Sequence, residues 1–465
     1  MFYYFLGIKG TGMSHLASLI KKTGARVEGE DVSLDFFTKP LYSQFNINPI
    51  GSHLPDGVDI FIYSTSFSKD NTAFKEAIER DIPHFTYPEY ISYLSRQKET
   101  LAVTGTHGKT TTCAVATYLL SKQNLDFTSL YGSFLKDYQT YYSNQGIFVV
   151  EGCEYQDHYQ AYELEALLIN SIDFDHPDYF ETISDVRSSF EKRALSVKPG
   201  GTIFFNVTDN EVKALYEKIK LQRPDVTLIT FGFNNNPDFL LTKGFNGVSI
   251  STLSSFAINP KEKEKHILSD YLGGALVSAY ALLKKQGRAI NFASLQSVIG
   301  PIFKDCETFP GVIARSEVIG ERDGIIYIDD YAHHPKEIKV ALSSISSKYP
   351  TRRIVLFFMP HTYSRTKALF KEFVDALSSV PILVVQNTYG ARHDLGDGED
   401  IALTLEKEIE KRSFRHFVLS QNMVFYSKDF SSSLSIAKAL LQSGDVLVTM
   451  GAGDNRKLID HLLNE

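Results

Sequence analysis

The sequence predicts an α/β protein of about three domains built on largely parallel β-sheets, and three observations support this fold class. The chain has 465 residues, whereas a single domain has roughly 100 to 200. Short apolar runs of strand length alternate along the chain with helical patterns, as they do in parallel sheets. Two of these strands, at residues 2–8 and 101–103, lead directly into glycine-rich turns that open helices. Such turns are typical of phosphate-binding folds.

The first glycine-rich turn is Gly7-Ile-Lys-Gly-Thr-Gly12, which precedes a helical pattern at residues 13–22. A second strand ends near Glu28–Asp31. Strand, glycine turn, helix and a strand ending in an acid form the Rossmann arrangement, in which the helix N-terminus binds a phosphate group. The glycines follow G-x-x-G-x-G, whereas dinucleotide-binding turns follow G-x-G-x-x-G. We therefore predict a nucleotide-diphosphate site over an NAD site, with a structural turn as the alternative.

The second glycine-rich turn is Gly105-Thr-His-Gly-Lys-Thr-Thr111, which opens a helical pattern at residues 109–122. Its two glycines let backbone N–H groups approach a phosphate, Lys109 supplies a positive charge, and the Thr110 hydroxyl can ligate Mg²⁺. The turn is tighter than the full Walker pattern, because Val103 stands where that pattern has its first glycine. Its position between a strand and a helix still predicts a phosphate-binding loop.

Polar groups follow the next two strands. A strand at residues 147–150 ends at Glu151, and another at residues 167–172 ends shortly before His176. Because ligands gather at the carboxyl ends of parallel strands, we expect both side chains to face the Lys109 loop. Carboxylate and imidazole suit one or two divalent cations beside a nucleotide. Helix caps or surface groups are the alternative interpretation.

We predict three domains, at residues 1–97, 98–310 and 311–465. A polar stretch at Ser95–Thr100 marks the first boundary, and the composition shifts at Phe309-Pro-Gly311.

Late in the middle domain, residues 227–256 indicate irregular β-structure, and residues 271–285 indicate a helix. We expect Gly273-Gly274 to interrupt that helix, since glycine destabilises helix interiors.

In the last domain, two apolar strands close on Asp329-Asp-Tyr-Ala-His-His-Pro335 and Met359-Pro-His-Thr-Tyr-Ser-Arg-Thr366. Further strands are expected at residues 382–385 and 446–449. Two adjacent histidines form a surface turn as readily as a site. At the carboxyl end of a strand, with Arg365 at the end of its neighbour, they become site candidates.

Composition excludes several classes of function. With a net charge of −7 and a pI of about 6.0, the chain has no overall positive charge that would attract nucleic acid. The three cysteines form no C-x-x-C pair, which disfavours a zinc site or a disulfide framework and fits a reducing compartment. No signal-peptide pattern or apolar run of membrane-spanning length is present. We expect a cytoplasmic protein that binds neither nucleic acid nor membranes.

Taken in order, these motifs resemble those of the Mur ligases of bacterial cell-wall synthesis, over essentially the whole chain. The motifs that carry the resemblance are Gly7-x-x-Gly10-x-Gly12-Met13, Gly105–Thr111, Glu151-x-x-Glu154, Asp175-His176, Asp329–Pro335 and Pro360-His-x-Tyr-Ser-Arg-Thr366. The resemblance implies a Rossmann-like UDP-binding domain, a central P-loop ATPase domain with a parallel sheet, and a C-terminal Rossmann-like domain that binds the amino acid and ATP.

Within this family the motifs favour one reaction. ATP would activate the carboxylate of UDP-N-acetylmuramate as an acyl phosphate, and the amine of L-alanine would displace the phosphate. The implied cofactors are ATP and Mg²⁺, because each step concentrates negative charge. The implied partners are these small substrates, and we expect a monomer or a weak homodimer.

The resemblance also implies roles for individual residues. ATP would be bound by Gly105, Thr106, His107, Gly108, Lys109, Thr110 and Thr111, with Arg315 near the terminal phosphate and Asp330 near the ribose. Mg²⁺ would be held by Thr110, Glu151 and His176, and the UDP diphosphate by Gly10, Thr11, Gly12 and Met13. His333 and Arg365 would bind the amino acid, with Arg365 pairing with its carboxylate. The implied catalytic residues are Lys109, Glu151, His176, His333 and Arg365.

The sequence departs from the family pattern at four places. The stretch Ser269–Ala275 lacks the His and Asn residues of the usual G-x-H-N-x-x-N, whose side chains contact adenine. A usual arginine pair is reduced to Ala314-Arg315, and Thr362 replaces another usual arginine. The usual R-x-E of the first domain reads Tyr87-Pro-Glu89. Loss of an arginine that recognises a carboxylate is not a conservative change.

Three alternatives remain open. A recycling ligase that adds a preformed peptide to the same sugar nucleotide would look similar, although Pro360–Thr366 and Gly451-Ala-Gly-Asp454 favour the alanine-adding reaction. The four departures are compatible with a diverged, non-catalytic binder of UDP-sugars. An NAD-dependent dehydrogenase is disfavoured by the glycine spacing and by Lys109.

Overall fold

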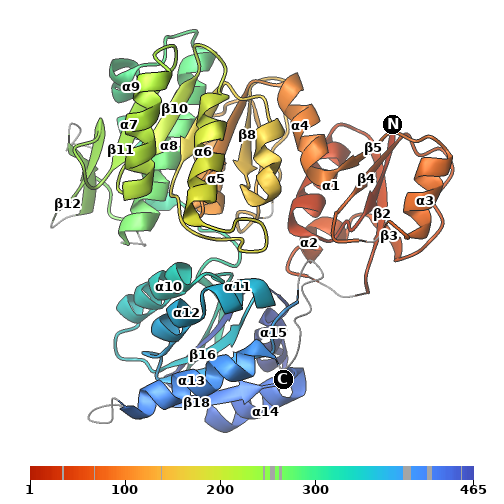
Figure 1. Ribbon diagram of the computed structural model, residues 1–465, viewed down its shortest axis with the longest axis vertical. Coiled ribbons are helices and arrows are strands. Elements are labelled where there is room, and N and C mark those ends of the chain that lie inside the picture. Colours follow the sequence, from red (N-terminus) through yellow and green to blue (C-terminus); the bar gives the residue numbers. More distant parts are fainter. Residues whose placement is uncertain are drawn as a thin grey trace. The chain divides into compact units, whose positions relative to one another are not determined.

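The computed structural model describes the chain except residues 34–35, 68, 138, 245–246, 252–256, 261–263, 391–399, 416–421 and 452. Strands and helices alternate along most of the chain, and the strands form three separate β-sheets of five, eight and six strands (Figure 1). The predicted α/β fold class is therefore confirmed. The residues group into two compact units, one of residues 1–174 and 179–312, the other of residues 175–178 and 313–465.

The first sheet has the strand order β3-β2-β1-β4-β5, and every described pairing in it is parallel. Its strands are β1 (Phe2–Leu6), β2 (Arg26–Asp31), β3 (Asn46–Pro49), β4 (Ile60–Tyr63) and β5 (His84–Thr86). Its helices are α1 (Thr11–Lys22), α2 (Lys39–Tyr42), α3 (Thr72–Glu79) and α4 (Tyr87–Gln97). The central strand β1 is buried along its whole length. The first glycine turn follows its carboxyl end and leads into α1.

The eight-stranded sheet has the order β13-β12-β11-β10-β9-β6-β8-β7, with one antiparallel pair at the β13 edge. Its strands are β6 (Thr100–Thr104), β7 (Phe127–Leu130), β8 (Ile147–Gly152), β9 (Ala166–Ile169), β10 (Thr202–Asn206), β11 (Thr227–Gly232), β12 (Phe239–Gly244) and β13 (Gly247–Ile250). Its helices are α5 (Lys109–Lys122), α6 (Ile183–Leu195), α7 (Asn210–Gln222), α8 (Lys265–Lys285) and α9 (Phe292–Lys304), with 3₁₀ helices η1 (Tyr155–Ala161) and η3 (Asp305–Thr308). The β-structure predicted over residues 227–256 is confirmed up to β13, and residues 252–256 lie outside the described residues.

Strand β6 pairs in parallel with β8 on one side and with β9 on the other. All five residues of β6 are buried. The carboxyl ends of these three strands therefore meet at one edge of the sheet, and they carry the second glycine turn, Glu151 and the residues after Ile169.

The six-stranded sheet has the order β14-β15-β19-β16-β17-β18 and is parallel except for β14. Its strands are β14 (Glu317–Arg322), β15 (Ile325–Asp330), β16 (Ile354–Met359), β17 (Ile382–Gln386), β18 (Met423–Ser427) and β19 (Val446–Gly451). Its helices are α10 (Pro335–Lys348), α11 (Tyr363–Ala368), α12 (Phe370–Leu377), α13 (Ile401–Arg415), α14 (Phe430–Leu440) and α15 (Arg456–Asn464). The predicted motif at 451–454 starts at the end of β19, and its Ala452 lies outside the described residues.

The polar stretch at residues 95–100 is not a separate linker. Helix α4 continues to Gln97 and β6 begins at Thr100, so two residues join them. The Ser95 side chain is buried and its hydroxyl donates to the Ser92 carbonyl. The exact domain limits at 97 and 310 stay predictions.

The expected interruption at Gly273-Gly274 is wrong, because α8 is continuous from Lys265 to Lys285. The two glycines instead allow α8 to pack closely on α5. A Cβ atom at Gly274 would lie 2.6 Å from Val115 Cγ1 and 2.9 Å from the Ala116 backbone nitrogen. The tertiary contact thus outweighs the low helix propensity of glycine.

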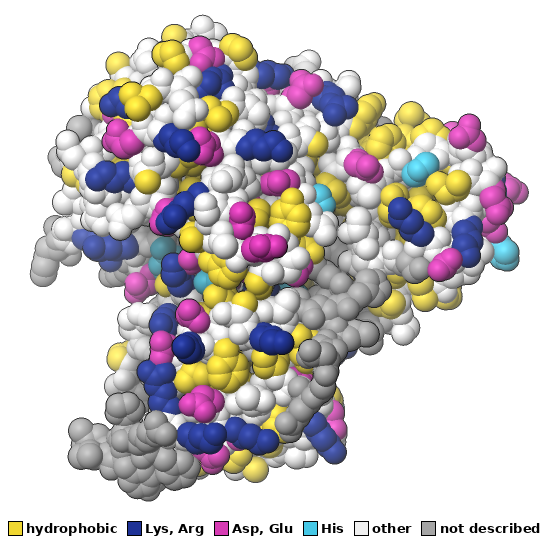
Figure 2. Space-filling view, viewed as in Figure 1, with side chains coloured by type: hydrophobic (Ala, Val, Ile, Leu, Met, Phe, Trp, Pro, Cys, Tyr) yellow, Lys and Arg dark blue, Asp and Glu magenta, His cyan; other side chains and the backbone are white. Residues whose placement is uncertain are grey.

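Charged side chains are mixed over the visible face of the molecule, where Lys and Arg alternate with Asp and Glu (Figure 2). Within the described ranges, no helix combines the length and apolar character needed to cross a membrane.

We predict that Gly274→Ala destabilises the protein by about 1–3 kcal/mol, because the added methyl group overpacks the α5–α8 contact. Gly273→Ala is the matched control on the same helix. Its Cβ would lie 3.2 Å from Thr112 Cγ2 and farther from other atoms, so its gain in helix propensity offsets the closer contact. Denaturant unfolding of both variants tests this prediction, and equal stabilities would contradict it.

Candidate active site

The second glycine turn connects the end of β6 to the start of α5. Gly105 has a φ angle of +138° and Gly108, the N-cap residue of α5, has +83°, a region that favours glycine. A Cβ at Gly105 would lie 2.8 Å from the Ser171 backbone nitrogen. The backbone thus requires glycine at both positions, and the turn presents the N-terminus of α5, as an anion-binding loop does.

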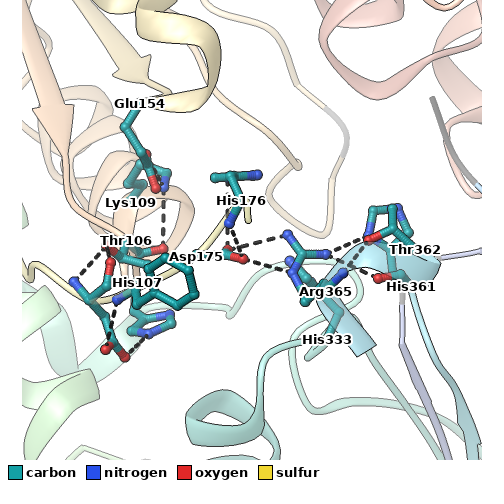
Figure 3. Close-up of polar contacts among 12 residues, drawn as sticks. Thr106, His107, Lys109, Glu154, Asp175, His176, His333, His361, Thr362 and Arg365 are labelled. Atoms are coloured by element: carbon teal, nitrogen blue, oxygen red, sulfur yellow. Dashed lines mark hydrogen bonds and ion pairs between the residues drawn. The ribbon is translucent and has the colours of Figure 1, made fainter. Parts of the chain in front are cut away.

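The Lys109 ammonium group is held inside this turn (Figure 3). Its Nζ atom donates to Glu154 Oε2 at 2.8 Å, to the Gly105 carbonyl at 2.5 Å and to the Thr106 carbonyl at 3.3 Å. The side chains of Lys109 and Glu154 are 12% and 2% exposed. Burial alone would lower the pKa of Lys109, but the Glu154 carboxylate outweighs it and raises the pKa. Lys109 therefore stays charged, and contact between its ammonium group and a phosphate, which stays a prediction, would require the phosphate oxygen to displace one of these three acceptors.

Glu154 is a site residue that the sequence did not assign. It stood inside the E-x-x-E motif without a predicted role. Only the buried ion pair with Lys109, 45 residues earlier in the chain, identifies it.

Two of the predicted metal ligands lie together. The Thr110 hydroxyl donates to Glu151 Oε2 at 2.9 Å, and the Gly132 backbone N–H donates to the same oxygen at 2.7 Å. A hydroxyl and a carboxylate at the start of α5 are hard oxygen ligands, which fit Mg²⁺. The donor set is therefore suitable for the ion. His176 groups with the second unit, so its share in the same metal site stays a prediction.

Residues after β9 fix the rest of the turn. The Thr106 backbone N–H donates to the Ser171 carbonyl at 2.9 Å, and the His107 N–H donates to Ser171 Oγ at 2.8 Å. His107 Nε2 lies 3.2 Å from Asp173 Oδ2. Thr111, the last residue of the motif, is partly exposed. Thr106 and His107 are thus engaged in shaping the loop through their contacts with Ser171 and Asp173.

A second unassigned residue is Asp270, on α8. A Cβ at Gly108 would lie 2.5 Å from Asp270 Oδ1. The Thr112 hydroxyl donates to the same oxygen at 3.2 Å, and the Asn170 amide donates to Thr112 at 2.8 Å. The stretch that departs from the family's adenine motif thus places a buried carboxylate against the loop. Asp270 is identified as a neighbour of the loop by its position in the structure, because no sequence motif links it to Gly108.

The first glycine turn leads into α1, whose N-cap residue is Gly10. Asp31, the acid that closes β2, accepts the Lys9 backbone N–H at 2.7 Å and is buried. This hydrogen bond therefore stabilises the backbone of the first glycine turn. Residues 11–13, the first three of α1, make no backbone hydrogen bond through their N–H groups to described residues, as is usual in a first helical turn.

In the second unit, Arg365 on α11 is fully engaged (Figure 3). Its Nε and Nη2 atoms donate to Asp175 at 2.7 and 3.3 Å, and Nη1 lies 2.8 Å from His361 Nδ1. The side chains of Arg365 and Asp175 are 3% and 7% exposed. Burial would raise the pKa of Asp175, but His176 and Arg365 hold it well below its ordinary range. Pairing of Arg365 with a substrate carboxylate stays a prediction and requires an exchange of partners.

The neighbouring histidines have distinct surroundings. Burial lowers the pKa of His333 to about 4, so its ring is neutral at pH 7. The His333 and His361 rings lie 5.5 Å apart, edge to face. His176 adopts a φ angle of +55°, and its backbone N–H donates to Asp175 Oδ1 at 2.7 Å. His333 and His176 thus both lie close to the Arg365–Asp175 pair.

Arg315 and Asp330 lie on the loop before β14 and at the end of β15. Asp330 accepts the Ser316 N–H at 2.7 Å and the Ala332 N–H at 2.7 Å. The Arg315 guanidinium lies over the Tyr331 ring, 5.3 Å from its centroid. Burial raises the pKa of Asp330, and Arg315 opposes this. Asp330 thus orders the chain around Arg315, and its predicted contact with a ribose remains untested.

Comparison with known proteins supports the predicted relationship. Three family models match consecutive parts of the chain: "Mur ligase family, catalytic domain" at residues 2–99, "Mur ligase middle domain" at 103–278 and "Mur ligase, glutamate ligase domain" at 314–453. The UDP-N-acetylmuramate–L-alanine ligase of Borreliella burgdorferi is 32% identical, over 99% of this chain and 98% of the relative. The chain belongs to the Mur ligase family. The predicted family and its three-domain architecture are confirmed.

Solved structures share the fold over the full length. The UDP-N-acetylmuramate-alanine ligase of Thermotoga maritima superposes with a TM-score of 0.75 at 22% identity, covering 100% of this chain and 99% of that one. A murein peptide ligase of Psychrobacter arcticus gives 0.69 at 18% identity, covering 100% and 98%. At these identities the likeness establishes the fold and leaves the choice of acceptor open.

Asp329, beside Asp330, predicts a pH dependence of stability. Burial raises the pKa of Asp329 to about 7, although the Thr449 hydroxyl donates to it at 2.7 Å. A raised pKa means that folding favours the protonated carboxyl. This stabilisation is complete below the unfolded pKa near 4 and is lost as the pH rises to about 7.

We therefore expect Asp329→Asn to gain stability relative to the wild type between pH 4 and pH 8, by on the order of 2–4 kcal/mol. Chemical unfolding at a series of pH values measures the difference. Asp323→Asn is the control, since the Asp323 side chain is 82% exposed. A difference between Asp329→Asn and wild type that does not change with pH would disprove the assignment.

Proposed function

We propose that this Mur ligase joins L-alanine to the carboxylate of UDP-N-acetylmuramate at the expense of ATP. A carboxylate oxygen would attack the terminal phosphorus of ATP and release ADP, giving an acyl phosphate. The amine of alanine would then attack the acyl carbon, phosphate would leave with both C–O bonding electrons, and the amine would lose a proton to solvent. Family membership, the full-length relative and the Lys109 loop support this proposal.

The observation that carries the proposal is the pairing of a buried lysine with a glycine turn at the start of α5. Lys109 and the N-terminus of α5 suit the phosphates of ATP, and Thr110 with Glu151 would hold Mg²⁺. The ion supplies charge neutralisation during phosphoryl transfer. The three free cysteines, Cys113, Cys153 and Cys306, agree with a cytoplasmic location.

The predicted acceptor site departs from the family pattern. Thr362 stands where the family has an arginine, and here it caps α11, its hydroxyl accepting the Arg365 N–H at 3.4 Å. The remaining cation, Arg365, would pair with the acceptor carboxylate, and the neutral His333 would lie beside it. One arginine and two imidazoles recognise an α-carboxylate without selecting a side chain.

Phosphate release in the presence of ATP, Mg²⁺ and UDP-N-acetylmuramate tests the proposal. We expect release to depend on an added amino acid, with L-alanine the best, and mass spectrometry to detect the alanyl product. Preference for a tripeptide would instead identify a peptide-recycling ligase. Binding of the sugar nucleotide without any acceptor-dependent release would identify a non-catalytic homologue.

Lys109 variants separate its chemical role from its structural one. Lys109→Met leaves the Glu154 carboxylate buried without its cation, so we expect a loss of about 3–5 kcal/mol of stability together with loss of turnover. The double variant Lys109→Met/Glu154→Gln removes both charges. We expect it to recover most of the stability while turnover stays at least about 10²-fold below wild type.

Thermal unfolding and phosphate release measure the two effects separately. Lys122→Met, at the other end of α5, is the matched control and should keep full turnover. A folded double variant that retains turnover would show that Lys109 does not contact the transferred phosphate.

A further inference from the structure

Tyr87 is the first residue of α4, and its position is fixed by the start of that helix. Thr86 and Glu89 form a capping box, in which the Thr86 N–H donates to Glu89 Oε2 at 2.7 Å and the Glu89 N–H donates to Thr86 Oγ1. Pro88 occupies the first turn, where the φ angle of proline suits a helix. The backbone of Tyr87 is thus ordered on both sides, which limits where its side chain can point.

The Tyr87 side chain reaches the start of α1. A Cβ atom at Gly12 would lie 2.7 Å from Tyr87 Cζ and 2.9 Å from its hydroxyl oxygen. Real Cβ atoms do not approach other atoms this closely, so the phenol occupies the space that glycine leaves open. The hydroxyl therefore lies against Gly12, in the first turn of α1.

Packing explains the ring but not the hydroxyl. The ring is partly exposed and packs against the core of the first unit. The hydroxyl makes no hydrogen bond with a described residue, whereas tyrosine hydroxyls in packed surroundings usually find a partner. Phenylalanine would satisfy the packing equally well. The hydroxyl is thus available to donate a hydrogen bond to a ligand at the first turn of α1.

The surroundings of the hydroxyl favour a neutral donor. Burial and then the neighbouring groups Tyr162, Glu151 and Cys153 raise the pKa of Tyr87 well above its ordinary value, so it keeps its proton at any physiological pH. A phenol can donate to an anionic ligand without neutralising Glu151.

We propose that the Tyr87 hydroxyl donates a hydrogen bond to a phosphate oxygen of the sugar nucleotide bound at Gly10–Met13. The inference rests on the proposed function, which assigns the diphosphate to the first turn of α1. It adds Tyr87 to the binding residues, at the position where the family pattern has an arginine. The charge on that phosphate is then balanced by backbone N–H groups and one neutral hydroxyl.

Calorimetric titration of the full chain with UDP, with UDP-N-acetylmuramate and with ATP–Mg²⁺ tests the proposal on Tyr87→Phe. We expect UDP and UDP-N-acetylmuramate to bind roughly ten-fold or more weakly, by a similar factor for both, because a hydrogen bond to a charged group is lost. ATP–Mg²⁺ should bind as it does to the wild type, and the melting temperature should stay within about 2 °C. Tyr93→Phe, the same substitution on the same helix at a side chain that is 43% exposed, should change nothing.

The outcomes are distinct. Unchanged affinity of Tyr87→Phe for UDP, in a wild type that binds UDP, would overturn the inference and leave the proposed function standing. Weakened binding of UDP-N-acetylmuramate alone would place the hydroxyl on the sugar or its carboxylate and would also overturn it. A wild type that binds no UDP compound would overturn the proposed function and the inference together.

Discussion

The buried charge of Lys109 is the constraint on which the rest of the site depends. An ammonium group in a packed loop must be hydrogen-bonded and paired. Its partners are Glu154 and two carbonyls of the turn, which closes around the ammonium because Gly105 and Gly108 permit its backbone. The same contacts that stabilise the loop keep the lysine charged. A phosphate group that binds Lys109, as proposed, would therefore have to compete with these protein acceptors for the ammonium group.

Two helices of the first unit follow glycine turns, and both helix N-termini are the proposed binding sites for phosphate groups. Gly10 is the N-cap residue of α1 and Gly108 that of α5, and each glycine turn follows the carboxyl end of a buried parallel strand, β1 or β6. Glu151 is held beside α5 by Thr110 and Gly132 and lies close enough to Tyr87 to affect its pKa. Tyr87 in turn contacts the first turn of α1.

Local sequence patterns predicted most of the helices and strands. The features that they did not predict depend on contacts between residues far apart in the sequence. The helix expected at residues 109–122 has those limits, since a glycine turn and a strand define its start. The predicted break at Gly274 failed because Val115, far away in sequence, needs the space. Asp270 reaches the Gly108 turn from α8, and Asp175 pairs with Arg365 across 190 residues of chain. Residues this far apart in sequence cannot be paired from motif spacing. Lys109, Glu151 and Arg365 were therefore predicted as site residues, but the residues that contact them were not.

A crystal structure with a non-hydrolysable ATP analogue and Mg²⁺ tests the central claim most directly. The account predicts that Lys109 Nζ exchanges one of its present acceptors for a phosphate oxygen, while the Thr110 hydroxyl and the Glu151 carboxylate bind metal. A structure in which the phosphates lie elsewhere and Lys109 keeps all three of its present partners would contradict it.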